Sequence, residues 1–231
     1  MDKLNKYDNN LLQCLGKIEF WVNGKRSLGS ASILKSLNAP VIATAAHCLY
    51  DWESKQFYEC IRFLPYSEDF KVAFKPVLAS IPKDWAQHGV VDYDTGFLVL
   101  EPEASNVINF EEKGIPVAFN MSRNLEYVIS GFQNVLLPSK KPLVSKGIAC
   151  TDSFKNSSLQ GVRSKGKSGM SGGPWFTEFE GRYIQNSNSS LSMKSVKNTL
   201  WGPYWGKTIE AAYQVASGEI SEDSAVLVHE Y

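Results

Sequence analysis

Short stretches of apolar and β-branched residues, each bounded by turn-forming residues, recur along the chain. The first of them, residues 16–22 (GKIEFWV), is followed directly by Asn23-Gly24. Asn-Gly is a strong signal for a two-residue hairpin, because both residues tolerate the positive φ that such a turn requires. We therefore predict a strand at 16–22, a turn at Asn23-Gly24 and a partner strand at about 27–34.

Further strands are predicted wherever the same pattern returns. They lie at residues 41–44, 61–65, 72–80, 95–100, 117–119, 127–131, 143–151, 173–177 and 182–186. The run 95–100 (TGFLVL) is almost continuously apolar, which is typical of a strand buried on both faces. Residues 101–116 are polar and include two prolines, so we expect a connector between two halves. Residues 186–198 are rich in serine and asparagine, and we expect a long surface loop there.

One stretch near the C-terminus has a helical period. Its apolar residues fall at positions i, i+3, i+4 and i+7, namely Ile209, Ala212, Tyr213 and Ala216. Gly218 follows as a stop signal. Many short strands and one late helix indicate an all-β sandwich or barrel rather than a sheet of alternating strands and helices.

Composition and charge exclude several classes of protein. The 231 residues include 24 Lys and Arg and 24 Asp and Glu, a balance that argues against nucleic-acid binding through a broad basic surface. With 43% hydrophobic and 21% charged residues the chain is not disordered. No apolar run approaches the ~18 residues of a membrane span, and the first ten residues lack the apolar core of a signal peptide. We expect a cytoplasmic protein if the chain is complete, and a secreted one if it is a trimmed mature form.

The four cysteines, Cys14, Cys48, Cys60 and Cys150, do not have zinc-site spacing. Three disulfide pairings are formally open, and the sequence does not choose among them. Because a chain of this length does not need a covalent staple, we favour buried free thiols.

Three segments carry residues able to perform covalent chemistry. His47 lies in a run of small residues (TAAHC, 44–48), and Ser171 lies among glycines (GMSGGP, 169–174). Asp94 stands directly before the apolar run 95–100, a position that would hold a carboxylate dry and fixed. Each also has a structural explanation: a core histidine, a glycine-rich turn and a plain turn before a strand. Their occurrence together favours the catalytic interpretation.

Together these segments resemble the chymotrypsin-like serine peptidases, whose catalytic triad runs His, Asp, Ser along the chain. More narrowly, the chain resembles the bacterial glutamyl-endopeptidase-like (trypsin-like) branch. Further matching stretches are residues 30–33 (SASI) and 201–206 (WGPYWG), and the resemblance covers roughly residues 15–216.

The resemblance implies an all-β fold of two six-stranded antiparallel β-barrels with a C-terminal helix. The whole chain, 1–231, would be a single peptidase domain. Residues 1–110 would form the N-terminal barrel with the first two triad residues, and residues 111–231 the C-terminal barrel with the third.

The resemblance also implies a serine endopeptidase acting on protein or peptide substrates, without metal or cofactor. Ser171 would be the nucleophile, His47 the general base and Asp94 the residue that orients the imidazole. The backbone N–H groups of Gly169 and Ser171 would form the oxyanion hole. A nucleic-acid or membrane partner is not expected, and no residue argues for a regulatory partner.

Departures from the family pattern bear on specificity. The glutamate-specific members use a pocket histidine in the strand after the serine, where this chain reads YIQNS at 183–187. Glutamate specificity therefore does not carry over, and Lys165, Lys167, Asn186 and Ser187 remain as candidate substrate-pocket residues. The two lysines could favour an acidic P1 residue, or could simply face solvent.

A cysteine that many family members carry near Ser30, paired with the one after the histidine, is missing. Cys48 must then pair elsewhere, with Cys60 the nearest candidate, or stay free.

Two other functions are compatible with parts of the sequence. The segment 169–173 also satisfies G-x-S-x-G, and Asp223 and His229 follow in the order of the α/β-hydrolase esterases. That fold requires alternating strands and helices, which the pattern does not offer. The chain could instead be a catalytically silent peptidase homologue that acts as a binding module, although all three triad residue types are present.

Overall fold

Antiparallel strands are the main regular elements of the structure, a computed structural model that describes residues 11–67, 71–134, 140–152, 156–164, 166 and 168–231. The first sheet contains seven strands. In spatial order they are β16 (Val226–Glu230), β7 (Pro76–Pro82), β8 (Gly96–Leu100), β3 (Val41–Thr44), β2 (Lys25–Ile33), β1 (Leu15–Val22) and β6 (Arg62–Pro65). A short pair, β4 (Tyr50–Asp51) with β5 (Gln56–Phe57), accompanies it.

The β1–β2 hairpin forms where the sequence predicts it. Val22 pairs with Lys25, which leaves Asn23 and Gly24 as a two-residue turn, with φ of 50° and 74°. This geometry is that of the turns that match the twist of the flanking strands.

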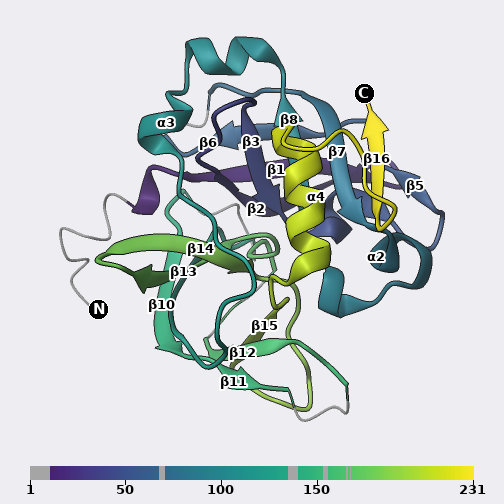
Figure 1. Ribbon diagram of the computed structural model, residues 1–231. Coiled ribbons are helices and arrows are strands. Elements are labelled where there is room, and N and C mark those ends of the chain that lie inside the picture. Colours follow the sequence, from purple (N-terminus) through teal and green to yellow (C-terminus); the bar gives the residue numbers. More distant parts are fainter. Residues whose placement is uncertain (1–10, 68–70, 135–139, 153–155, 165, 167) are drawn as a thin grey trace.

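The second half of the chain builds two smaller sheets. One has four strands, in the order β10 (Leu143–Ile148), β9 (Glu126–Gly131), β13 (Pro174–Phe179) and β14 (Arg182–Asn188). The other has three, in the order β11 (Cys150–Thr151), β12 (Gln160–Arg163) and β15 (Thr199–Gly202). Figure 1 shows these strands gathered in one half of the molecule and the seven-stranded sheet in the other.

Helices occupy the connections. Helix α4 (Lys207–Ser217) packs against β7 and β8 and ends at Gly218, which adopts the left-handed conformation with φ of 73°. The remaining helical elements are α2 (Lys83–His88), α3 (Phe110–Lys113), η1 (Ala46–Cys48), η2 (Val91–Tyr93) and η3 (Pro102–Asn106). None of the helices in the described part of the chain is long and apolar enough to cross a membrane.

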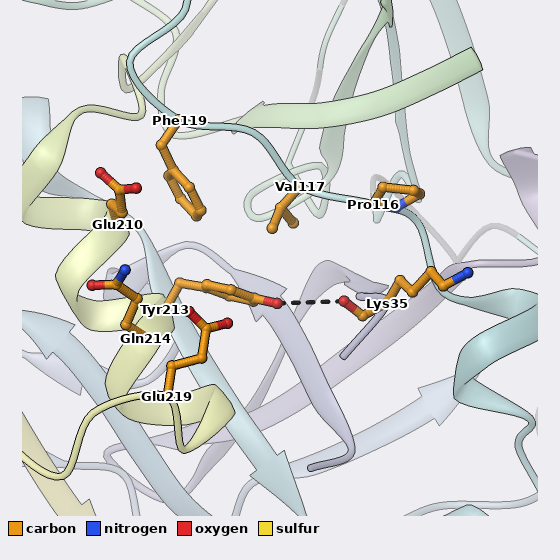
Figure 2. A pocket seen from close by; sticks show the side chains of 8 residues that line it. All are labelled: Lys35, Pro116, Val117, Phe119, Glu210, Tyr213, Gln214 and Glu219. Atoms are coloured by element: carbon orange, nitrogen blue, oxygen red, sulfur yellow. Dashed lines mark hydrogen bonds between the residues drawn. The ribbon is translucent and has the colours of Figure 1, made fainter. Parts of the chain in front are cut away.

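Helix α4 also contacts the start of the second half. Figure 2 shows the Tyr213 side chain reaching from α4 to the backbone carbonyl of Lys35, to which its hydroxyl donates a hydrogen bond of 3.3 Å. Phe119 lies above the Tyr213 ring, with 5.5 Å between the ring centroids. A cavity of about 350 Å³ opens between these side chains, and none of its lining residues belongs to the three catalytic motifs.

The all-β fold with a C-terminal helix is confirmed, but three sequence expectations need correction. The first sheet has seven strands because β16 follows α4 and pairs with β7. Residues 226–230 thereby join the sheet of residues 15–100. Residues 117–119 are not a strand; Val117 makes one isolated parallel bridge to Gln185.

The third correction concerns residues 186–198, which the sequence predicts as a surface loop. Their first part, up to Ser190, is buried, and residues 186–188 belong to β14. Hydropathy misses this because the buried serine and asparagine side chains form hydrogen bonds inside the molecule, which removes most of the cost of burying them. Strands β4, β5, β12, β15 and β16 were also not predicted.

Candidate active site

The end of β3 and the start of β8 bring His47 and Asp94 together. His47 lies in η1, directly after β3, and Asp94 lies between η2 and β8. The imidazole Nδ1 is 2.7 Å from Asp94 Oδ2, and the His47 backbone N–H donates to Asp94 Oδ1 at 2.9 Å. Both carboxylate oxygens therefore act on one residue, which fixes the imidazole and leaves Nε2 for proton exchange.

Burial differs sharply between the two side chains. Asp94 has 2% of its side chain exposed, whereas His47 has 33% exposed. The carboxylate is thus shielded from water, while the imidazole reaches the surface, where another molecule can meet it.

This pairing shifts the pKa values of both side chains. Burial alone would lower the pKa of His47, but the Asp94 carboxylate, with a smaller contribution from Cys48, raises it well above the ordinary value of 6.5. Burial alone would raise the pKa of Asp94, but His47 and the hydrogen bonds from His47 and Ser190 lower it below 3.8. The pair favours a charged carboxylate beside an imidazole that accepts a proton readily.

Two polar residues of the second half support Asp94. The Ser190 hydroxyl donates to Asp94 Oδ2, and the Asn188 side-chain amide donates to the Asp94 backbone carbonyl at 3.0 Å. The sequence analysis missed both residues. The only signal was the unusual density of serine and asparagine in this stretch, which it interpreted as a loop.

The serine loop is built around Ser30 of β2. The Ser30 backbone N–H donates to the Ser171 carbonyl at 2.7 Å, and the Ser30 hydroxyl donates to the Gly169 carbonyl at 2.8 Å. The same hydroxyl accepts from the Phe132 N–H at 2.8 Å. One buried serine therefore holds the backbone on both sides of Met170.

Close packing places the serine loop against the residues that precede His47. Gly172 has a φ of +80°, and a Cβ at that position would lie 2.1 Å from Thr44 Oγ1 and 2.8 Å from the Ala45 nitrogen. Only glycine allows this approach. Ser171 thus sits one residue from a backbone contact with the segment 44–45, which leads into His47.

The backbone around Gly169 has a defined orientation. The Ser168 carbonyl accepts a hydrogen bond of 2.7 Å from the Asn134 N–H. Because the peptide is trans, the Gly169 N–H points away from Asn134. Within the described residues, neither this N–H nor that of Ser171 donates to a protein acceptor.

The predicted substrate-pocket residues fare differently. Lys165 and Lys167 lie outside the described residues. Asn186 is 4% exposed and Ser187 is fully buried, with its hydroxyl donating to the Pro203 carbonyl at 2.7 Å. These two residues belong to the core and present no open surface to a substrate, because the bulged strand β14 turns them inward.

A cavity of about 380 Å³ is lined instead by Ser164, Gly166 and residues of the stretch 192–199. Its walls come from the segment before Ser171 and the segment after Ser190. Its polar and charged lining residues include Ser164, Ser192, Lys194 and Lys197. The sequence analysis did not single out these residues.

Other motifs in the sequence do not join this site. The His229 ring stacks on Phe57 at 4.8 Å, and Asp223 accepts a hydrogen bond from the Ala225 N–H. The α/β-hydrolase interpretation is wrong, because the fold is all-β.

All four cysteines are free, as expected, but only Cys14 and Cys48 are buried, whereas Cys60 and Cys150 are exposed. Among the described residues no group of three or more His, Cys, Asp or Glu side chains could hold a metal ion.

Comparison with solved structures identifies the fold. No protein-family profile and no curated protein sequence matches the chain. The protease Anisep from Arthrobacter nicotinovorans is 26% identical, with a TM-score of 0.77 over 89% of this chain and 96% of that one. The thermostable serine protease AL20 from an extremophilic microorganism is 28% identical, with a TM-score of 0.78 over 91% of this chain and 100% of that one.

A third structure, of lower identity, shares the fold. A Glu endopeptidase is 13% identical, with a TM-score of 0.69 over 94% of this chain and 95% of that one, which supports the fold but only weakly the narrower branch. The two protease structures of higher identity cover about nine tenths of the chain. The chain therefore has the fold of the chymotrypsin-like serine proteases.

Proposed function

We propose that the protein is a serine endopeptidase that hydrolyses peptide bonds with His47, Asp94 and Ser171. The observation that carries the proposal is the imidazole contact of 2.7 Å to a buried carboxylate, with the serine loop packed against the same segment. The two serine proteases that are 26% and 28% identical support a protein or peptide substrate. We propose further that residues 1–231 form one peptidase domain, with the site between its two halves.

The mechanism follows from the roles that the geometry suits. Ser171 Oγ attacks the scissile carbonyl while His47 Nε2 accepts its proton, and the imidazole then gives that proton to the leaving amine. In the second half of the reaction, water attacks the acyl-enzyme carbonyl while His47 Nε2 accepts its proton. The imidazole then returns the proton to Ser171 Oγ, and the carboxylic acid product is released. Asp94 holds Nδ1–H, fixes the tautomer and stabilises the imidazolium that forms.

The Gly169 and Ser171 N–H groups suit an oxyanion hole. Each is uncommitted within the described residues, and the Asn134 contact directs the Gly169 N–H away from the loop 132–134. One such donor contributes about 2.7–4 kcal/mol to lowering the barrier.

We propose that the cavity lined by Ser164, Gly166 and residues of the stretch 192–199 is the pocket for the P1 side chain. Its position between the segments that carry Ser171 and Ser190 supports this role. Lys194 and Lys197 on its lining favour an acidic side chain, as opposite charges attract. Profiling the cleavage sites in a proteome digest tests this: acidic P1 residues should be enriched, and Lys194→Gln with Lys197→Gln should remove the enrichment.

Covalent labelling provides the test of the main proposal. A fluorophosphonate probe should label the wild-type protein and fail to label Ser171→Ala, and the same substitution should abolish turnover of a peptide library. Ser54→Ala, which removes an exposed hydroxyl between β4 and β5, is the matched control and should still be labelled. Labelling that survives in Ser171→Ala would refute the assignment.

The same fold also occurs in a structure named human heparin binding protein, 13% identical with a TM-score of 0.65. The fold by itself therefore does not separate a peptidase from a binding module. A folded wild-type protein that takes up no probe and cleaves no peptide would favour the binding function.

A further inference from the structure

Asp94 accepts hydrogen bonds at its backbone carbonyl as well as at its carboxylate. We propose that Asn188 is a positioning residue for Asp94, acting with Thr95 and Trp205 to fix the Asp94 backbone across the junction of the two halves. The inference rests on the proposed function, because positioning matters only if the His47–Asp94 pair is catalytic.

Asn188 uses both ends of its side-chain amide. Its Nδ2 donates to the Asp94 carbonyl at 3.0 Å. Its Oδ1 accepts from the Thr95 hydroxyl at 2.6 Å and from the Trp205 indole N–H at 3.1 Å. The indole N–H also lies 3.1 Å from the Thr95 hydroxyl oxygen, which closes a ring of three side chains.

The three side chains come from different parts of the fold. Thr95 directly precedes β8 of the first sheet, Asn188 ends β14 of the second half, and Trp205 precedes α4. Exposed fractions of 0%, 0% and 1% show that water does not compete for these hydrogen bonds. A fully satisfied buried network of this kind is rigid and specific in geometry.

The indole is itself fixed by packing. The Trp205 ring stacks on Phe119 with centroids 5.6 Å apart and an angle of 19°, and meets Phe97 of β8 edge-on at 5.7 Å. Its N–H therefore has one direction, and it aims at Asn188 and Thr95.

The backbone at Asp94 explains why it needs this support. Asp94 has φ of −73° and ψ of 63°, and the Thr95 N–H donates to the Tyr93 carbonyl at 2.7 Å. These values describe an inverse γ-turn centred on Asp94. A rotation of this single tight turn would swing the carboxylate away from His47. The Asn188 amide holds the carbonyl of the turn, and so resists that rotation.

The expected consequence is on the His47–Asp94 contact rather than on substrate binding. Asp94 and Cys48 are the titratable groups that act on His47, so a misaligned Asp94 would let the pKa of His47 fall toward its ordinary value. Misplacement by about 1 Å costs up to ~100-fold in rate, so we expect a partial loss of about tenfold for a loosened turn.

The test compares three variants at buried positions. Asn188→Ala should lower kcat about tenfold or more with little change in KM, and should lower the pKa of His47 measured by NMR titration of the three histidines. Thr95→Val removes one member of the ring with little change in shape and should move both quantities in the same direction. Thr95→Ser keeps the hydroxyl and should restore wild-type values.

Ser187→Ala is the matched control, because it removes a buried hydrogen bond one residue earlier on β14 without touching the Asp94 turn. If Asn188→Ala does not fold, the Thr95 pair decides the question. An unchanged kcat and His47 pKa in Thr95→Val, or the same losses in Ser187→Ala, would overturn the positioning role.

The NMR readout needs no catalysis. If the wild-type protein is inactive but Thr95→Val lowers the pKa of His47, the contact with the Asp94 turn is supported while the proposed function is refuted. A fully active Thr95→Val with an unshifted His47 would do the reverse.

Discussion

Replacing Ser30 by alanine tests whether its hydroxyl fixes the backbone around Gly169, which carries a proposed oxyanion-hole donor. In the wild-type protein this hydroxyl donates to the Gly169 carbonyl and accepts from the Phe132 N–H, both at 2.8 Å. Ser30 is fully buried, so water cannot replace the lost oxygen. The backbone N–H of residue 30, which holds the Ser171 carbonyl, survives the substitution.

The expected loss of stability follows from these two hydrogen bonds. Leaving a buried donor or acceptor unsatisfied costs about 1–3 kcal/mol. The Gly169 carbonyl and the Phe132 N–H both lose this hydroxyl, so we expect the free energy of unfolding to fall by about 2–6 kcal/mol. The Gly169–Met170 peptide also loses an anchor, which loosens the adjacent Ser168–Gly169 peptide that carries the oxyanion donor. Because full removal of one oxyanion donor lowers kcat about 100- to 1000-fold, a loosened donor should lower it about tenfold.

The assay pairs urea unfolding with kcat measured on a peptide substrate. Ser32→Ala is the control: it lies on the same strand, is equally buried and loses a 2.7 Å hydrogen bond to the Gln185 side chain. It should lose stability but retain kcat. Equal values of kcat in Ser30→Ala and Ser32→Ala would refute the reasoning, because the Ser30 hydroxyl would then contribute only to stability.

Three further predictions concern the same region. Gly172→Ala would place a Cβ 2.1 Å from a hydroxyl oxygen at a φ of +80°, so urea unfolding should show a loss of about 2–4 kcal/mol; a loss under about 0.5 kcal/mol would contradict the packing. Gly29→Cys would place its Cβ 2.9 Å from Cys48 Sγ, so the two residues should form a disulfide. For a closed loop of roughly 20 residues, this bond should stabilise the protein by about 3 kcal/mol. Thiol titration checks it, and four or more free thiols after oxidation would contradict the prediction. The base must be neutral, so wild-type kcat/KM should rise with pH through a His47 pKa above 6.5. Asp94→Asn should move that rise to lower pH, since the carboxylate that raises the pKa of His47 is then gone, and should lower kcat by about 10⁴-fold; an unmoved profile would exclude His47 as the base.

Much of the architecture is readable from local pattern. The strands at 16–22, 41–44 and 127–131 lie within or at observed strands, because each combines β-branched or aromatic residues with a clear turn on one side. The helix and its glycine stop also follow from periodicity alone, since Gly218 supplies the left-handed residue that ends α4.

The parts that escaped prediction are those that depend on distant partners. Asn188 and Ser190 look like loop residues in sequence, and only the approach of Asp94 from the other half makes their burial favourable. Strand β16 has a mixed burial pattern at the edge of its sheet, so its composition gives little contrast with a loop. The serine and histidine motifs were visible because glycine and small residues mark close backbone approach in the sequence itself.

The path of the last 25 or so residues affects how the molecule comes apart. After the second half is complete, the chain returns to the first sheet through α4 and adds β16 beside β7. Helix α4 and β16 both pack on the first sheet, so the second half is joined to that sheet by two chain connections, one on each side of it. Because the second half is tied to the first sheet at both of its ends, the two halves should melt in one cooperative transition.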